Sequence, residues 1–272
     1  MQTNTAISPA QVATVAQTPG RSSSLTEDGF LNGRLNVLQP EKGFRAGIDS
    51  VFLAATIPCD PGETIFEAGI GTGVASLCVA ARVKDVHITG VELSGRYAMI
   101  GKKNAANNGF ENNIRFITGD VKEALRRDLA DWPAHGSFSH AFANPPYFDN
   151  NTILKSPNSL KAAANGFGPE DLDLWVKVLG TMVAMRGTVT FVHRAEAVGR
   201  LLTAMEGKFG DIRIAPLHAR EGMAATRVII QGVRGTKGPL QLLPGLILHS
   251  SGNAFTPEAE AILRDGMSWR LR

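Results

Sequence analysis

Cysteine is scarce in this 272-residue chain, and its scarcity argues against a fold held together by disulfide bonds or by a cysteine-bound metal ion. The two cysteines, Cys59 and Cys78, form neither a C-x-x-C pair nor a cluster with histidine. The six histidines share no metal-ligand spacing either. We therefore expect no disulfide framework and no metal site, and a reducing compartment such as the cytoplasm suits the chain.

Long apolar runs and a strong charge are also missing. No run approaches the roughly 20 residues of a membrane span, and the N-terminus lacks the charged start and apolar stretch of a signal peptide. The net charge of +3 permits an anionic partner such as RNA but does not indicate one. With 43% hydrophobic residues, the chain can bury a sizeable core. We expect a cytoplasmic protein that contacts no membrane.

The first 28 residues offer little to bury, because they are rich in Gln, Thr, Ser, Ala, Pro and Gly. We expect residues 1–28 to be a disordered leader, with a partner-binding arm as the alternative. Residues 29–272 are expected to form one domain.

Beyond the leader, strand patterns alternate with helical patterns. We expect strands over 35–39, 63–67, 86–92, 113–118, 138–143, 187–193, 212–215 and 227–233. We expect helices over 48–57, 74–83, 97–107, 121–129, 171–185 and 195–208. Such alternation implies right-handed crossovers. It predicts an α/β fold of the Rossmann-like kind, with a mostly parallel sheet and helices on both faces.

In such a sheet the binding crevice lies beyond the carboxyl ends of the strands, and a glycine-rich turn follows one of those ends. In Glu67-Ala-Gly-Ile-Gly-Thr-Gly73, the glycines allow a tight turn and close approach of a ligand to the main chain. The helix that follows offers free N–H groups. The glycine spacing departs from G-x-G-x-x-G, and no phosphate-loop Lys-Ser/Thr follows. A purely structural turn is the alternative.

Acidic residues follow the next two strands. Glu92, about 20 residues after the glycines, is placed to accept hydrogen bonds from both hydroxyls of a ribose, or is only a surface carboxylate. Asp120 is placed to accept a hydrogen bond from an adenine amino group. It is also a good helix N-cap, and the two roles are compatible.

The fourth segment, Asn144-Pro-Pro-Tyr147, carries the most specific chemistry. Its prolines end strand pairing and fix the chain. A planar amino group is a poor nucleophile until acceptors hold its hydrogens and turn the lone pair toward an electrophile. The side-chain oxygen of Asn144 and the carbonyl of Pro145 supply two such acceptors, and Tyr147 offers a flat face for a flat substrate. A structural turn would explain the prolines but not their neighbours.

Together these four segments resemble the class I S-adenosylmethionine-dependent methyltransferases, whose fold has a seven-stranded sheet. Asn-Pro-Pro-Tyr resembles the motif of the branch that modifies amino groups of adenine or glutamine. The segments 44–54, Phe-Arg-Ala-Gly-Ile-Asp-Ser-Val-Phe-Leu-Ala, and 225–230, Ala-Thr-Arg-Val-Ile-Ile, are similar to the bacterial tRNA1(Val) (adenine(37)-N6)-methyltransferase family. The likeness covers about residue 28 to the C-terminus.

The resemblance implies S-adenosylmethionine as the cofactor and a role for each motif residue. The residues implied to bind the cofactor are Glu67, Gly69, Gly71, Gly73, Glu92, Asp120 and Asn144. Those implied to hold the target amino group are Asn144, Pro145 and Tyr147, with Phe148 adding stacking surface. Gly47-Ile-Asp49 would form a lid over the cofactor.

The leading hypothesis is N6-methylation of an adenine in RNA, foremost at position 37 of a tRNA anticodon loop, where the base is already single-stranded. Lys155 and Lys161, in a long segment over 149–169, would contact the RNA backbone, or that segment is only a solvated loop. An N5-glutamine methyltransferase acting on a protein is the alternative, although those enzymes have an N-terminal helical domain. A non-catalytic RNA-binding module comes third. Monomer and homodimer both stay open.

Overall fold

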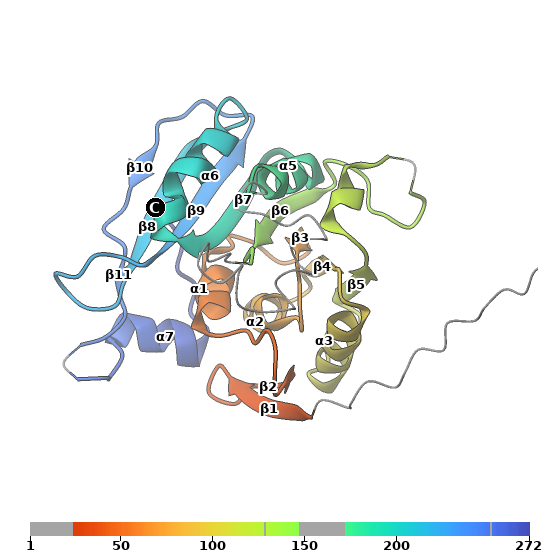
Figure 1. Ribbon diagram of the computed structural model, residues 1–272, viewed down its shortest axis with the longest axis horizontal. Helices are drawn as coiled ribbons and strands as arrows, with labels where there is room; N and C mark the ends of the chain where they lie inside the picture. Colours follow the sequence, from red (N-terminus) through yellow and green to blue (C-terminus); the bar gives the residue numbers. More distant parts are fainter. Residues whose placement is uncertain (1–23, 128, 147–171, 251) are drawn as a thin grey trace, which may run out of the picture.

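Residues 24–127, 129–146, 172–250 and 252–272 are described in the computed structural model of the chain, and Figure 1 shows their arrangement. The strands of the main sheet are β3 (Thr64–Ala68), β4 (His87–Glu92), β5 (Ile114–Thr118), β6 (Phe138–Ala143), β7 (Val183–Arg194), β8 (Phe209–His218), β9 (Arg227–Arg234), β10 (Gln241–Leu242) and β11 (Leu246–Ile247). They are ordered β10-β8-β9-β7-β6-β3-β4-β5, with β11 also beside β8.

The order of the strands creates one switch point in the middle of the sheet. From β3 the chain moves outward to β4 and β5, and then returns to β6 on the other side of β3. These four strands and β7 are parallel, whereas β9 runs antiparallel to both β7 and β8. Ligands of open α/β sheets bind at such a switch point, beyond the carboxyl ends of the strands. The predicted mostly parallel sheet is confirmed, with β10 and β11 added to the seven expected strands.

Helices cover both faces of the sheet, as predicted (Figure 1). The helices are α1 (Ile48–Thr56), α2 (Val74–Arg82), α3 (Gly95–Asn107), α5 (Leu172–Met182), α6 (Val198–Met205) and α7 (Pro257–Asp265). One core cluster joins α1, α2 and α7 through side chains such as Phe52 and Leu77. The other joins α5 and α6 through Leu179 and Leu201. The strands between the two clusters are buried on both sides, which explains the apolar run of β6.

Several expected boundaries were wrong. Residues 121–129 do not form an α-helix: Val121–Leu125 is a 3-10 helix, η1, which ends at Arg126 in extended conformation. Its buried residues, Val121 and Ala124, are three apart, which suits three residues per turn. The expected leader over 1–28 overlaps β1 (Leu25–Phe30), which pairs with β2 (Leu35–Pro40) in a separate hairpin, and residues 1–23 lie outside the described residues.

The expected helix over 195–208 is also interrupted. It consists of a 3-10 turn, η3 (Ala195–Ala197), followed by α6. The preceding strand, β7, begins at Val183 and so replaces the last residues of the helix that we expected to reach 185.

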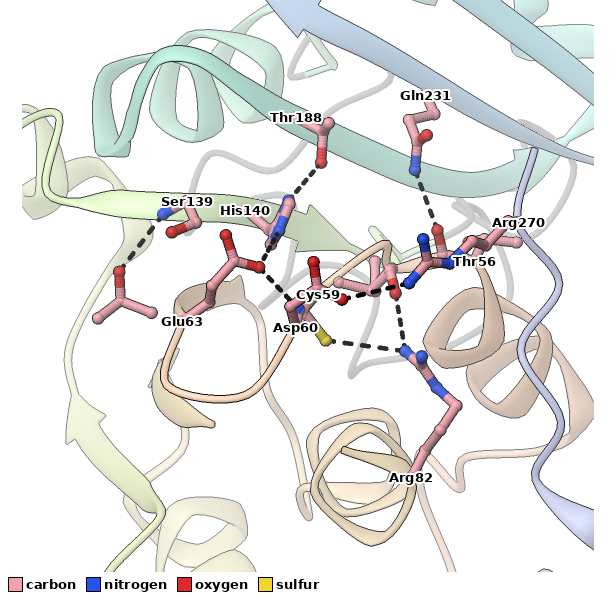
Figure 2. A network of polar contacts seen from close by, with 12 residues as sticks. Thr56, Cys59, Asp60, Glu63, Arg82, Ser139, His140, Thr188, Gln231 and Arg270 are labelled. Atoms are coloured by element: carbon pink, nitrogen blue, oxygen red, sulfur yellow. Dashed lines mark hydrogen bonds and ion pairs between the residues drawn. The ribbon is translucent and has the colours of Figure 1, made fainter. Parts of the chain in front are cut away.

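A buried polar network fixes α1 against the sheet and against α2 (Figure 2). The side-chain amide of Gln231 in β9 donates to the carbonyl of Thr56 at 3.1 Å and to the hydroxyl of Thr190 at 3.0 Å. The guanidinium group of Arg82 donates to the carbonyls of Ala54 and Ile57 at 3.0 and 2.7 Å. These bonds satisfy carbonyls at and just after the end of α1, where the carbonyl of Ala54 also accepts from the amide of Ile57 at 3.3 Å.

The described part of the chain contains neither a membrane-spanning helix nor a disulfide bond. None of its helices combines the length and the apolar character that a membrane crossing requires. Its two cysteines are both free and buried.

Candidate active site

The glycine-rich turn after β3 lies at the switch point and depends on glycine for its shape. Gly69, Gly71 and Gly73 have positive φ angles of 73°, 57° and 88°. A Cβ atom at Gly69 would lie 3.0 Å from the Trp175 ring, and one at Gly73 would lie 3.0 Å from the Phe116 ring. Any other residue would therefore be strained at 69 and 73 both by conformation and by packing.

The same turn leads directly into α2. Gly73 is the N-cap of α2, and because it has no side chain it leaves the N–H groups of the first turn uncapped by that residue. The main chain of the turn is held to β4, since the amides of Gly69 and Ile70 both donate to the carbonyl of Val91, at 2.9 and 3.0 Å. The turn is thus a rigid surface of backbone.

Glu67, near the end of β3, is a buried acid beneath this turn. Only 3% of its surface is exposed, and the hydroxyl of Ser76 donates a short hydrogen bond to its Oε2. Burial raises the pKa of Glu67 to about 8, against the lowering effect of Ser76, and the nearby Glu92 raises it further. At neutral pH the carboxyl group is therefore mostly protonated, and a neighbouring positive charge would favour its ionised form.

Glu92 ends β4 and connects the turn to the next loop. Its Oε2 accepts a hydrogen bond from the amide of Gly71 at 2.9 Å, and its Oε1 accepts one from the amide of Ser94 at 2.8 Å. Burial raises the pKa of Glu92, and the two amide bonds oppose that effect. Glu92 is thus partly buried and held by two amides. Its contact with a ribose stays a prediction.

Asp120 follows β5, where Thr118 lies beside Glu92 in register. Its Oδ1 accepts a hydrogen bond from the amide of Lys122 at 2.9 Å, so the capping role is confirmed. Its other carboxylate oxygen, Oδ2, is the one that would accept a hydrogen bond from the adenine amino group of the cofactor. This role stays a prediction.

Asn144 leaves β6 next to the glycine turn. Ala143 pairs with Ala68 in register, so Asn144 and Gly69 both begin directly beyond neighbouring parallel strands. Asn144 is partly buried, Pro145 is buried and Pro146 is exposed. The structure therefore brings the predicted amide to the predicted cofactor turn. Tyr147, Phe148, Lys155 and Lys161 lie outside the described residues, and their roles stay predictions.

Sequence reasoning missed an aromatic side chain over the turn. The Phe44 ring is half exposed, and its Cε1 lies 3.7 Å from where a Cβ of Gly71 would be. The hydroxyl of Tyr97 accepts a hydrogen bond from the Phe44 amide at 3.3 Å. The lid expected over 47–49 stays a prediction: Gly47 is the N-cap of α1, and Asp49 accepts a hydrogen bond from Arg227 at 3.0 Å.

Comparisons with known proteins agree with this geometry. A family model described as "Methyltransferase domain" matches residues 65–153. A predicted O-methyltransferase from Agrobacterium tumefaciens has the same fold, with a TM-score of 0.68 and 23% identity over 82% of this chain and 98% of that one. The chain contains a class I S-adenosylmethionine-dependent methyltransferase domain. It is therefore a methyltransferase, and S-adenosylmethionine is its methyl donor.

This methyltransferase also has distant curated relatives along most of its length. The tRNA1(Val) (adenine(37)-N6)-methyltransferase of Actinobacillus succinogenes is 23% identical over 239 residues, which are 88% of this chain and 96% of that protein. The enzyme of the same name from Shewanella baltica strain OS155 is 25% identical over 188 residues, 69% of this chain and 76% of that protein. The homology is distant.

The residues of the methyltransferase site fit this cofactor. The turn presents backbone without side chains at three positions, so a ligand can lie against the main chain. Glu67 is a buried acid whose ionised form a cationic methionine group would stabilise. Glu92 is held at the end of β4 by two amides, and each of its oxygens retains a lone pair for a hydroxyl donor.

Proposed function

We propose that this methyltransferase modifies the N6 amino group of an adenine in RNA, and that its target is an adenine of a tRNA anticodon loop, position 37. The observation that carries the proposal is the position of Asn144 and Pro145. They leave β6 one strand away from the cofactor turn, in register with it. A methyltransferase that modifies a hydroxyl or a carbon has no need of an amide and a fixed carbonyl at that place.

Asn144 and Pro145 act by positioning the amino group. The cofactor supplies a methyl group bound to a sulfonium. The side-chain oxygen of Asn144 and the carbonyl of Pro145 accept the two amino hydrogens, so the nitrogen lone pair points at the methyl carbon. When bound, S-adenosylmethionine would supply this methyl group, and its sulfur would keep the electron pair of the C–S bond as the N–C bond forms. The extra proton then leaves the nitrogen for water, because the methylated nitrogen is acidic.

The acidic residues serve the cofactor rather than the transfer. We assign Glu67 to the cationic methionine portion, Glu92 to the ribose hydroxyls and Asp120 to the adenine amino group. The glycine turn allows the close approach that these contacts need. Tyr147 and Phe148 are assigned to stacking on the target base, and Lys155 and Lys161 to the RNA backbone.

Distant homology supports RNA as the substrate. Relatives named tRNA1(Val) (adenine(37)-N6)-methyltransferase align with 88% of this chain, and the alignment spans almost their whole length. A loop adenine is unpaired, so moving it into a pocket costs only a few kcal/mol or less. A target base beyond the end of β6 is therefore taken more easily from a single strand than from a duplex.

The test is methyl transfer with isotope-labelled S-adenosylmethionine. The purified protein is incubated with tRNA from a strain that lacks the gene, and the RNA is digested to nucleosides for mass spectrometry. We expect labelled N6-methyladenosine. Label in a protein fraction, on glutamine, with none in RNA, would replace the proposal with the glutamine alternative.

A further inference from the structure

A second cavity opens at the same edge of the sheet as the active site. It has a volume of about 400 Å³ and is lined by His218 at the end of β8, by the loop that follows, and by Pro244 and Ile247 beside β11. In Figure 1 this region lies on the side of the molecule where β8, β11 and their loops meet. The volume lies within the range of ligand sites, about 300–1,000 Å³.

Strand order relates this cavity to Asn144. The strand β8 ends at the same edge as β6, because β7 is parallel to β6 and β9 is antiparallel to both β7 and β8. Three strand spacings separate β6 from β8, which amounts to about 14 Å. The cavity lies farther out than the end of β8, in the loop region. It is too far from Asn144 to hold the target base, yet within reach of other nucleotides in the same loop.

Two side chains of the cavity lining, those of His218 and Glu221, can accept hydrogen bonds. The ring Nδ1 of His218 lies 2.8 Å from the carbonyl of Met223, which only accepts, so Nδ1 donates. In the neutral ring Nε2 is then an acceptor, and the exposed carboxylate of Glu221 is another. Two acceptors favour a ligand that presents an amino group.

The other lining side chains offer apolar surface. Met223 is 52% exposed, and Pro244 and Ile247 also belong to the lining. Thioether and imidazole groups pack well against flat rings. A planar ligand with an exocyclic amino group fits both the apolar and the polar lining, and a nucleobase other than uracil has this composition.

Arginines lie between the two sites. Arg194 ends β7 and pairs in register with Arg227, which begins β9. Both, together with Arg200, act on His193 by their charge, and with burial they help to lower its pKa to about 4. Arg227 bonds to Asp49 and Arg194 to Glu196, so the surface is only mildly positive. Arg227 also donates to the carbonyl of Thr226 at 3.3 Å, and the positive charge of the two guanidinium groups attracts phosphate groups.

We propose that this cavity binds a second nucleobase of the RNA whose adenine is methylated, a base with an exocyclic amino group. The sugar-phosphate chain between the two bases passes over Arg194 and Arg227. This inference rests on the proposed function. It gives the enzyme a way to select its RNA at a position that it does not modify.

The test uses two exposed loop residues and matched controls. We expect Met223→Ser and Glu221→Ala to raise the KM for a tRNA stem-loop about tenfold each, while kcat at saturating RNA and affinity for S-adenosylmethionine change less than threefold. Met185→Ser and Glu206→Ala alter a methionine and a glutamate that are exposed at the amino ends of β7 and β8. These controls should match the unmodified enzyme.

Base substitution in the RNA separates recognition from a structural effect. Each loop nucleotide other than the target is changed to uridine in turn. At one position the change should raise KM about tenfold for the unmodified enzyme and less than twofold for Glu221→Ala. Equal KM values for the two loop variants and their controls would overturn the second base site and leave the proposed function intact. Failure of the unmodified enzyme to methylate any RNA would overturn both.

Discussion

At the scale of single residues, we assign the side-chain amide of Asn144 to hold the target amino group. Replacing it by alanine removes one of two acceptors that aim the amino group. We expect Asn144→Ala to lower kcat about 10²- to 10³-fold, as removal of one preorganised hydrogen-bonding group does elsewhere. The dissociation constant of S-adenosylmethionine should change less than threefold in isothermal titration calorimetry.

The control is Asn36→Ala, which changes an exposed asparagine of β2 and should leave both constants unaltered. If Asn144→Ala instead loses cofactor binding to the same extent as activity, its amide serves the cofactor and not the substrate.

The raised pKa of Glu67 predicts that the free energy of unfolding depends on pH. Its pKa is about 8 in the fold and 4.5 as a free group. Below pH 4.5 both states hold the proton. Between these values only the folded state keeps it, so the free energy of unfolding falls as pH rises, by at most about 1.4 kcal/mol per pH unit. Above 8 the loss is complete. Glu67→Gln, which has no proton to lose, should show no such fall.

Urea unfolding of both proteins from pH 5 to 9, without cofactor, gives the measurement. Parallel curves for the two proteins over that range would mean that Glu67 is ionised in the fold.

Glu92 allows its cofactor role to be separated from its structural one. Glu92→Ala leaves the amides of Gly71 and Ser94 without their acceptor, so it should weaken binding for two reasons. A cofactor analogue without the ribose 2′-hydroxyl isolates one of them. We expect the unmodified enzyme to bind this analogue about tenfold more weakly than S-adenosylmethionine, and Glu92→Ala to bind the two equally. A tenfold preference that survives in the variant would place the ribose elsewhere.

The sequence indicated these acidic residues because each stands at or near the end of a strand of a parallel sheet, and parallel strand ends meet at one edge. It did not indicate that Phe44 lies over Gly71, since this contact depends on how the segment after β2 folds back. Arg45, bonded to Thr26 at 2.6 Å, helps to fix that fold.

At the scale of elements, α1 is held by side chains from distant parts of the chain. Gln231 is buried and donates to both Thr56 and Thr190. Gln231→Leu would leave a buried carbonyl and a buried hydroxyl without this donor. We expect it to lower the free energy of unfolding by about 1–3 kcal/mol in urea titration. Gln241→Leu, on the exposed strand β10, should change it by less than about 0.5 kcal/mol. If the two variants lower the free energy of unfolding equally, the buried network around Gln231 does not contribute to stability.

Elements with a clear apolar pattern were predictable, and those without one were not. The strand β1 is polar and belongs to a two-stranded hairpin, and β10 and β11 have two residues each. The helix α7 was missed although its signals are present. Thr256 caps it, Pro257 begins it, and Gly266 ends it with a positive φ. Only Ala259 and Ile262 of this helix are buried, so its apolar periodicity is too weak to stand out.

At the scale of the whole molecule, the order of strands explains why segments 77 residues apart in sequence form one site. The turn that starts at Glu67 and the segment that starts at Asn144 follow neighbouring strands at the switch point. The meeting of these two segments at one edge of the sheet could be predicted from the alternation of strands and helices in the sequence. The second cavity could not be predicted, because a loop after β8 and the segment around Pro244 form it together and share no motif.

The central claim is that Asn144 directs methyl transfer to an adenine of tRNA. The most direct measurement is mass spectrometry of the anticodon-loop nucleosides of tRNA from cells that lack the gene, with and without a plasmid copy. We expect N6-methyladenosine at position 37 of one tRNA to be lost on deletion, to return with the unmodified gene, and to stay absent with Asn144→Ala. Unchanged N6-methyladenosine on deletion would overturn the proposed function, and its return with Asn144→Ala would overturn the role of Asn144.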